Sequence, residues 1–272
     1  MKSPLIFLCV ALLISAAMAR LNAQEVNMQP GVAYVMSTRG TVLKHHNGVA
    51  ARLEKGMSLP ARDIDIETRP GAFVLIVFSN GLSLYAMDEA RFSVESFVQE
   101  PFKSSPDDWA YEPSRSVLRM HQRSGRLAYY RPQGDPASTL EIETQLGTIS
   151  SLSDFFGIET SPDRSVDVWL FSEQGTAIFQ RARYDRDFIQ AGQHFQVEAS
   201  GQGDNTLIDY DPINTADRQF FRLVQRRLEN ARERIFFQTK QSENGSWDVT
   251  PHVVIDADAL KRERSSEYFI HR

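Results

Sequence analysis

Residues 62–85 read RDIDIETRPGAFVLIVFSNGLSLY, and this stretch decides the fold class. In residues 64–68, apolar side chains alternate with acidic ones, which is the period-2 pattern of a strand with one buried face. The turn residues 69–71 precede an unbroken apolar run over residues 73–78, typical of a strand buried on both faces. Asn80-Gly81 then predicts a hairpin with a return strand. The stretch therefore predicts consecutive β-strands with charges on their outer face.

Similar signals recur along the chain and predict a mainly β protein. Short strand-forming runs, several of them opened by a glycine turn, continue to about residue 199. The glycine intervals are irregular, which favours stacked or sandwiched antiparallel hairpins over a strict repeat. Residues 100–115 contain three prolines and predict a long loop. Ser124-Gly125 predicts a turn between two further strands. We expect one all-β domain over residues 31–199.

A polar linker over residues 200–213 leads to a predicted C-terminal amphipathic α-helix, capped by Asn214 or Thr215 and ending near Gln238. Apolar residues spaced by three and four positions form one face, namely Phe221, Val224, Leu228, Ala231 and Ile235. Its other faces carry the arginines Arg218, Arg222, Arg226, Arg227, Arg232 and Arg234. Either the apolar face packs on the β domain, or the basic face docks on a partner or an anionic surface. A short strand pair and a charged tail complete residues 214–272.

The first 19 residues have the pattern of a secretory signal peptide. Lys2 is followed by an apolar core and by the A-x-A site Ala17-Met18-Ala19. We expect cleavage after Ala19, with cleavage after Ala23 as the alternative. An uncleaved membrane anchor is disfavoured because the apolar run is shorter than the roughly 20 residues that a span needs. The mature chain is expected to be periplasmic or secreted, without a membrane span.

Charge and cysteine content narrow the class of protein. The full sequence has a formal net charge of −5, so that loss of Lys2 leaves −6 and nucleic acid is not expected as a partner. Cys9 is the only cysteine and lies in the signal peptide. The mature chain would therefore contain no disulfide, cysteine ligand or thiol nucleophile. At about 250 residues it must be held together by its core.

Catalytic and metal-binding signals are weak. None of the common nucleophile, zinc, nucleotide or calcium motifs occurs. His45 and His46 are adjacent, and side chains at adjacent strand positions point to opposite faces, so we expect a solvated hairpin tip. Asp63, Asp65 and Glu67 could form an acid–base set for glycoside chemistry, but on one strand they would line a solvated face about 7 Å apart. We expect a non-enzymatic protein without cofactor or metal.

Two groups of residues are candidates for contact with a partner or ligand. Trp109 and Tyr111 lie in the predicted loop 100–115, where exposed aromatic side chains often anchor a partner. Alternatively, they fold back and cap the edge of the sheet. The second group lies on the basic face of the helix and comprises Arg222, Arg226 and Arg227.

Several motifs over residues 39–197 resemble, in order and spacing, a FecR-type domain. In the 62–85 stretch, Thr68, Ala72 and Asn80-Gly81 match the Thr, Ala and Asp-Gly of its core pattern, while Arg62-Asp63 replaces Gly-Asp. Further matches are Gly40-Thr41-Val42, Leu53-Glu54-Lys55-Gly56, Ser124-Gly125-Arg126-Leu127, Ile142-Glu143-Thr144, Gln174-Gly175-Thr176-Ala177 and Ala191-Gly192-Gln193. The departures are Gln145, where proline is usual, and Leu152-Ser153, where Gly-Thr is usual.

The resemblance implies a periplasmic β domain that binds a partner. Better-known members are anti-sigma regulators, with a cytoplasmic part, one transmembrane helix and this domain receiving a signal from an outer-membrane receptor. Here a signal peptide directly precedes the domain, which implies a secreted or periplasmic FecR-domain module. We expect this module to be non-catalytic and to bind an envelope protein or cell-wall glycan. Its role would lie in envelope signalling or organisation. The alternative is a carbohydrate- or peptidoglycan-binding protein that uses Trp109 and Tyr111 as stacking platforms.

Overall fold

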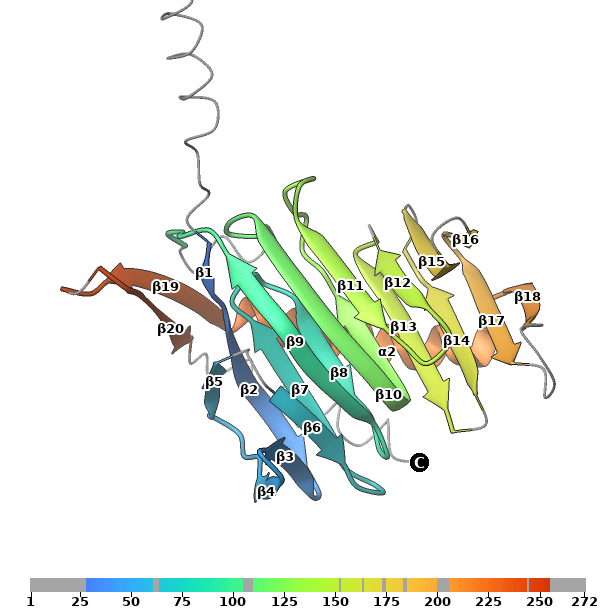
Figure 1. Ribbon diagram of the computed structural model, residues 1–272, viewed down its shortest axis with the longest axis horizontal. Helices are drawn as coiled ribbons and strands as arrows, with labels where there is room; N and C mark the ends of the chain where they lie inside the picture. The colour runs from blue at the N-terminus through green and yellow to red at the C-terminus, as the bar shows by residue number, and fades with distance from the viewer. Residues whose placement is uncertain are drawn as a thin grey trace, which may run out of the picture.

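The computed structural model describes residues 28–60, 64–104, 110–151, 153–162, 164–172, 175–182, 185–199, 206–243 and 245–254. These residues form two packed β-sheets, a helix behind one of them and a separate two-stranded ribbon at one side (Figure 1). The predicted signal peptide, Asp63 and Trp109 lie outside the described residues.

The sheet that lies against the helix is here called sheet B, and its described strands are all antiparallel. In spatial order they are β5 (Ser58–Pro60), β2 (Val32–Arg39), β7 (Phe73–Phe78), β8 (Ser83–Ala86), the second half of β10 (Ser116–Tyr130), β13 (Phe155–Ser161), β14 (Ser165–Leu170), β17 (Gln193–Ala199) and β18 (Thr206–Pro212).

The opposite sheet, here called sheet A, contains one parallel pair among the described strands, β10 with β11. In spatial order its strands are β4 (Val49–Arg52), β3 (Val42–His46), β6 (Ile64–Thr68), β9 (Arg91–Gln99), the first half of β10, β11 (Thr139–Glu143), β12 (Thr148–Ser151), β15 (Thr176–Ala182) and β16 (Asp185–Gln190). The short β1 (Gln29–Pro30) pairs with the end of β9.

Strand β10 joins the two sheets. Its first half pairs with β9 and β11 in sheet A, and its second half pairs with β8 and β13 in sheet B. The turn that we predicted at Ser124-Gly125 is therefore wrong, because the chain continues as one 15-residue strand. Gly125 has φ +78°, and a Cβ atom there would lie 2.4 Å from Cα of Ala90. Glycine allows the strand to change sheets at this point.

The 62–85 stretch forms β-strands as predicted and supplies both sheets. β6 lies in sheet A between β3 and β9, whereas β7 lies in sheet B between β2 and β8, so the turn at residues 69–71 crosses from one sheet to the other. The β7–β8 hairpin is confirmed, and the Asn80 side chain accepts a hydrogen bond from N–H of Leu82 at 3.1 Å within its turn. β7 is buried on both faces, as its apolar run predicts.

The main core lies between the two sheets. Alternate residues of β7 (Val74, Ile76, Phe78) and of β6 (Ile64, Ile66) point into it with at most 1% of their surface exposed. Inward-facing residues of the other strands complete the layer. The predicted fold class, mainly β with sandwiched antiparallel strands and one C-terminal helix, is confirmed.

Helix α2 (Thr215–Glu233) packs on the outer face of sheet B, where it is drawn behind the strands in Figure 1. Asn214 caps the helix by accepting a hydrogen bond from N–H of Asp217 at 2.9 Å. The predicted apolar face is buried against β7, β8, β10, β13 and β14, through Phe221, Val224, Leu228 and Ala231. The apolar face of the helix therefore packs on the β domain, as the first of the two interpretations expects, while Arg222 and Arg226 stay exposed.

The C-terminal segment differs from the sequence prediction in three places. α2 ends at Glu233 rather than near Gln238, because the strand-forming run that follows builds β19 (Ile235–Gln241). β19 pairs along its whole length with β20 (Trp247–Val253), so the separate terminal strand pair that we predicted does not form. The predicted linker also contains β18, which pairs with β17.

The described parts of the predicted loop 100–115 are anchored at its two ends. N–H of Glu100 donates to O of Arg115 at 2.9 Å, and N–H of Glu112 donates to O of Gln133 at 2.9 Å. The Glu112 side chain is 3% exposed and accepts a hydrogen bond from the Ser116 hydroxyl at 2.5 Å. A buried carboxylate thus lies at the base of the loop.

We expect Glu112→Gln to stabilise the protein more at neutral than at acidic pH. Burial raises the pKa of Glu112, and hydrogen bonds from Ser116 and Ser138 and the charge of Arg131 offset only part of this rise. A raised folded-state pKa gives stability that is full below the unfolded pKa and is lost as the pH rises through the folded pKa. The melting temperature of the variant relative to wild type should therefore increase between about pH 4 and about pH 7.

The exposed Glu143→Gln substitution serves as the control for this pH series. In the control, the melting temperature relative to wild type should stay constant with pH. If Glu112→Gln behaves in the same way, Glu112 is not a buried carboxyl group that favours its neutral form.

Candidate binding site

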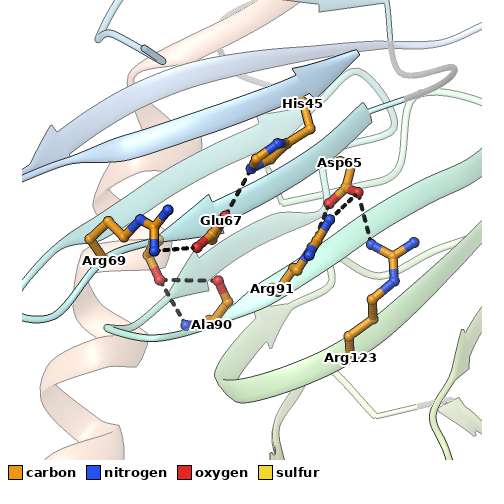
Figure 2. Close-up of polar contacts among 8 residues, drawn as sticks. His45, Asp65, Glu67, Arg69, Ala90, Arg91 and Arg123 are labelled. Carbon is orange, nitrogen blue, oxygen red and sulfur yellow. Dashed lines mark hydrogen bonds and ion pairs between the residues drawn. The ribbon is translucent and has the colours of Figure 1, made fainter. Parts of the chain in front are cut away.

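The outer face of sheet A carries the carboxylates Asp65 and Glu67 in ion pairs (Figure 2). Glu67 contacts His45 Nε2 at 2.9 Å and the Arg69 guanidinium at 3.0 Å. Asp65 accepts hydrogen bonds from Arg91 at 3.0 and 3.3 Å and from Arg123 at 2.9 Å. Side chains from β3, β6, β9 and β10, with Arg69 of the following turn, therefore form two ion-pair groups on this face, one around Glu67 and one around Asp65.

This arrangement gives the two carboxylates structural partners rather than an acid–base pair. Burial raises the pKa of Asp65, but the hydrogen bonds and charges of Arg91 and Arg123 outweigh burial and lower it below its usual value. A general acid for glycoside chemistry needs the opposite shift. The geometry thus gives no support to glycan hydrolysis by Asp65 and Glu67.

The histidine pair lies where the sequence placed it, at the β3–β4 hairpin. His45 contacts Glu67, whereas His46 contacts Asn47 Nδ2 at 3.2 Å, so the two rings take different partners. Asn47 and Gly48 have positive φ, as expected for a tight hairpin turn. In the part of the chain that the structure describes, no group of three or more His, Cys, Asp or Glu side chains could hold a metal ion.

Of the two candidate aromatics, only Tyr111 falls within the described residues. Its side chain is 60% exposed, while its backbone bridges to Gln133 and its carbonyl oxygen lies 3.5 Å from Arg232 Nη2. Tyr111 is therefore an exposed ring on a fixed backbone and does not cap the sheet edge.

The helix arginines separate into two groups. Arg227 donates to the Tyr85 hydroxyl at 3.3 Å, and its guanidinium lies 5.8 Å from the Phe73 ring centroid, so it helps to hold α2 on sheet B. Arg232 is 3% exposed and donates to O of Ile235 at 2.9 Å. The prediction that Arg227 is a partner contact and that Arg232 lies on a solvated face is thus not supported. Arg222 and Arg226 are exposed, as predicted.

Arg222 also lines a pocket of about 580 Å³ between the first half of α2 and the adjacent ends of sheet B. The lining residues come from α2 and from four connections at the strand ends, and they are Asp154, Phe155, Phe171, Ser172, Gly192, Ile213, Arg218, Arg222 and Gln225. Backbone hydrogen bonds fix this edge, with N–H of Gly192 donating to O of Leu170 at 2.7 Å and N–H of Ile213 donating to O of Gly192 at 3.1 Å.

The basic side of the pocket is formed by Arg218 and Arg222, which lie one helical turn apart. Arg218 Nε donates to O of Ile213 at 3.2 Å. Within the described residues, neither guanidinium forms an ion pair with a carboxylate. Two neighbouring positive charges without an internal counter-charge favour binding of an anionic group.

The pocket lining also includes one carboxylate, Asp154. Asp154 is exposed and accepts a hydrogen bond from Ser172, whose hydroxyl also accepts from N–H of Phe155 at 3.2 Å. The pocket residue Gln225 donates to Glu229 at 2.9 Å. Burial raises the pKa of Glu229, the hydrogen bond from Gln225 lowers it, and the charges of Glu233 and Asp154 raise it further. Residues of both charge signs thus line the same pocket.

Sequence reasoning found only the helical half of this site. Arg222 was a candidate residue and Arg218 was assigned to the basic face of the helix. Asp154, Ser172 and Gly192 carried no signal, because they lie in separate connections that only the folded sheet brings together.

The comparisons with known proteins give a distant similarity. No protein-family model and no curated protein matches the chain. Two crystal structures of candidate anti-sigma factors from Parabacteroides distasonis ATCC 8503 are similar to it. One has 8% identity and a TM-score of 0.41, covering 75% of this chain and 90% of its own. The other has 10% identity and a TM-score of 0.39, covering 75% and 91%.

The structure also bears on membrane crossing by helices. Among the residues that it describes, no helix has both the length and the apolar character that a membrane span needs.

Proposed function

We propose that this protein is a non-catalytic binding module of the FecR type, secreted or periplasmic, that acts in envelope signalling or organisation by docking an acidic surface of an envelope protein. The resemblance of residues 39–197 to FecR-type domains supports the class. The placement of the charges supports the mode of binding, because Asp65 and Glu67 are neutralised by ion pairs. In the described part of the chain, Arg218, Arg222 and Arg226 form no ion pair with a carboxylate.

The observation that carries the proposal is the solvent side of α2. The helix is fixed on sheet B by its apolar face, so that its exposed side presents Arg218, Arg222 and Arg226 at intervals of four residues. A row of arginines on a rigid helix, with no ion pair in the described structure, complements a negatively charged partner surface. Complementary charge of this kind increases the rate and specificity of association.

The proposal predicts that Arg222→Glu/Arg226→Glu removes partner binding. Purified mature protein and the variant would serve as baits for envelope extract, with the captured protein then titrated against both in purified form. We expect at least about a hundredfold loss of affinity, because two attractive contacts become repulsive. Raising the salt concentration should weaken binding of the wild type in the same direction.

The matched control is Arg52→Glu/Arg186→Glu, which reverses two exposed arginines on β4 and β16 of sheet A. Its net charge equals that of the helix variant, so it separates a local contact from a general charge effect. Equal loss of binding in both variants, or full binding by the helix variant, would refute the docking surface.

One observation favours the alternative of carbohydrate or peptidoglycan binding. The Tyr111 ring is 60% exposed on an anchored backbone, which suits stacking against a sugar ring. Saturable binding of muropeptides that is lost in Tyr111→Ala would support this alternative. A flat isotherm with the intact protein would remove it.

A further inference from the structure

The pocket beside α2 has a charge arrangement that differs from the rest of the helix surface. Arg218 and Arg222 line it together with the carboxylate Asp154, and Asp154 is close enough to Glu229 to raise the pKa of that carboxyl. Arg226, four residues beyond Arg222, does not line the pocket. The pocket therefore complements a ligand that carries a negative and a positive group at the same time.

Apolar residues also contribute to the lining of the pocket. Phe155 and Ile213 are buried residues whose surfaces contribute to the pocket, and Phe171 is half-buried beside them. The Phe171 ring is held at 4.2 Å from the Phe221 ring and 5.4 Å from the Phe155 ring, measured between centroids. A volume of about 580 Å³ lies within the range of small-molecule sites. Rigid aromatic walls of this kind accept an apolar side chain.

We infer that the pocket binds a short zwitterionic peptide, with its carboxylate at Arg218 and Arg222, its ammonium group at Asp154, and an apolar side chain against the half-buried ring of Phe171. A guanidinium pair recognises a carboxylate through charge-assisted hydrogen bonds. Asp154 is already oriented by its hydrogen bond from Ser172, and Gln225, whose amide donates to Glu229, also lines the pocket. This inference deepens the proposed function and rests on it, because it gives the binding module a small ligand next to its docking face.

The test is calorimetric titration of the full mature chain with the dipeptide Leu-Leu and two blocked forms. N-acetyl-Leu-Leu lacks the ammonium group, and Leu-Leu amide lacks the carboxylate. We expect saturable binding of Leu-Leu and at least about tenfold weaker binding of each blocked form. In Arg222→Gln, Leu-Leu and Leu-Leu amide should bind with equal affinity. In Asp154→Asn, Leu-Leu and N-acetyl-Leu-Leu should bind with equal affinity. Arg52→Gln, at an exposed arginine on β4 of sheet A, is the matched control and should leave all three isotherms unchanged.

Two outcomes would overturn the inference: absence of saturable Leu-Leu binding up to roughly 10 mM, or equal affinity for the free and blocked peptides. The single variant Arg226→Glu tests the peptide site and the docking surface separately. It should weaken binding of the protein partner and leave the affinity for Leu-Leu unchanged. If no peptide binds but binding of the protein partner still depends on Arg226, only the assigned ligand is wrong. If docking also fails, the proposed function is wrong as well.

Discussion

Replacing Phe221 by alanine is expected to lower the free energy of unfolding by about 3–5 kcal/mol, one of the two largest effects that the structure predicts. Phe221 is fully buried and lies between Phe155, Trp169 and Phe171, with ring centroids 4.2–6.2 Å apart. It also covers Gly157 of β13, where a Cβ atom would come within 2.6 Å of the Phe221 ring. The side chain therefore fills the contact between α2 and sheet B, and its loss leaves a cavity. Urea unfolding would measure the change.

Phe220→Ala is the matched control because the neighbouring ring is only half-buried. We expect this variant to lower the free energy of unfolding by about 1 kcal/mol, because the substitution removes less buried apolar surface. A cost below about 1 kcal/mol for Phe221→Ala would mean that α2 is not held on sheet B by this residue. The docked helix, and with it the fixed row of arginines, would then be in error.

Gly125→Ala is expected to lower the free energy of unfolding by about 3 kcal/mol or more. The positive φ of +78° is unfavourable for alanine by about 1–2 kcal/mol, and the new methyl group would lie 2.4 Å from Cα of Ala90. Backbone cannot move aside as a flexible side chain can, so the clash adds to the conformational cost. The point at which β10 passes from sheet A to sheet B should thus be among the least tolerant positions in the chain.

Gly71→Ala isolates the two contributions. Gly71 has φ +71°, but a Cβ atom there meets nothing within 4 Å, so this variant should lose only the conformational part, about 1–2 kcal/mol. Thermal or urea unfolding of both variants gives the difference. Equal costs for the two substitutions would show that the close approach of Gly125 to Ala90 is absent.

The parts of the fold that could be predicted are those governed by local pattern. The alternation in residues 64–68, the apolar run 73–78 and the Asn80-Gly81 turn all form the structures that their spacing predicts. The apolar face of α2 follows in the same way, because the 3.6-residue period is a property of the segment itself. In contrast, the helix end was predicted too late, since Ile235 continues the apolar spacing while belonging to β19.

The parts that could not be predicted depend on contacts between distant segments. Nothing in residues 64–78 indicates that β6 and β7 enter opposite sheets, because either arrangement buries the same side chains. The glycine at position 125 has the sequence appearance of a turn, and only its pairing with β13 shows a continuous strand. The acidic side of the pocket is likewise assembled from residues far apart in the chain, such as Asp154 and Gln225.

The proposed binding mode requires that the exposed arginine face of α2 contacts an envelope partner. Site-specific photo-crosslinking in intact cells tests it, with the photoreactive residue placed at Arg226 and, for comparison, at the exposed Arg52 of sheet A. If α2 docks the partner, position 226 should give a discrete adduct with one envelope protein, and position 52 should not. No adduct from position 226, or the same adducts from both positions, would contradict it.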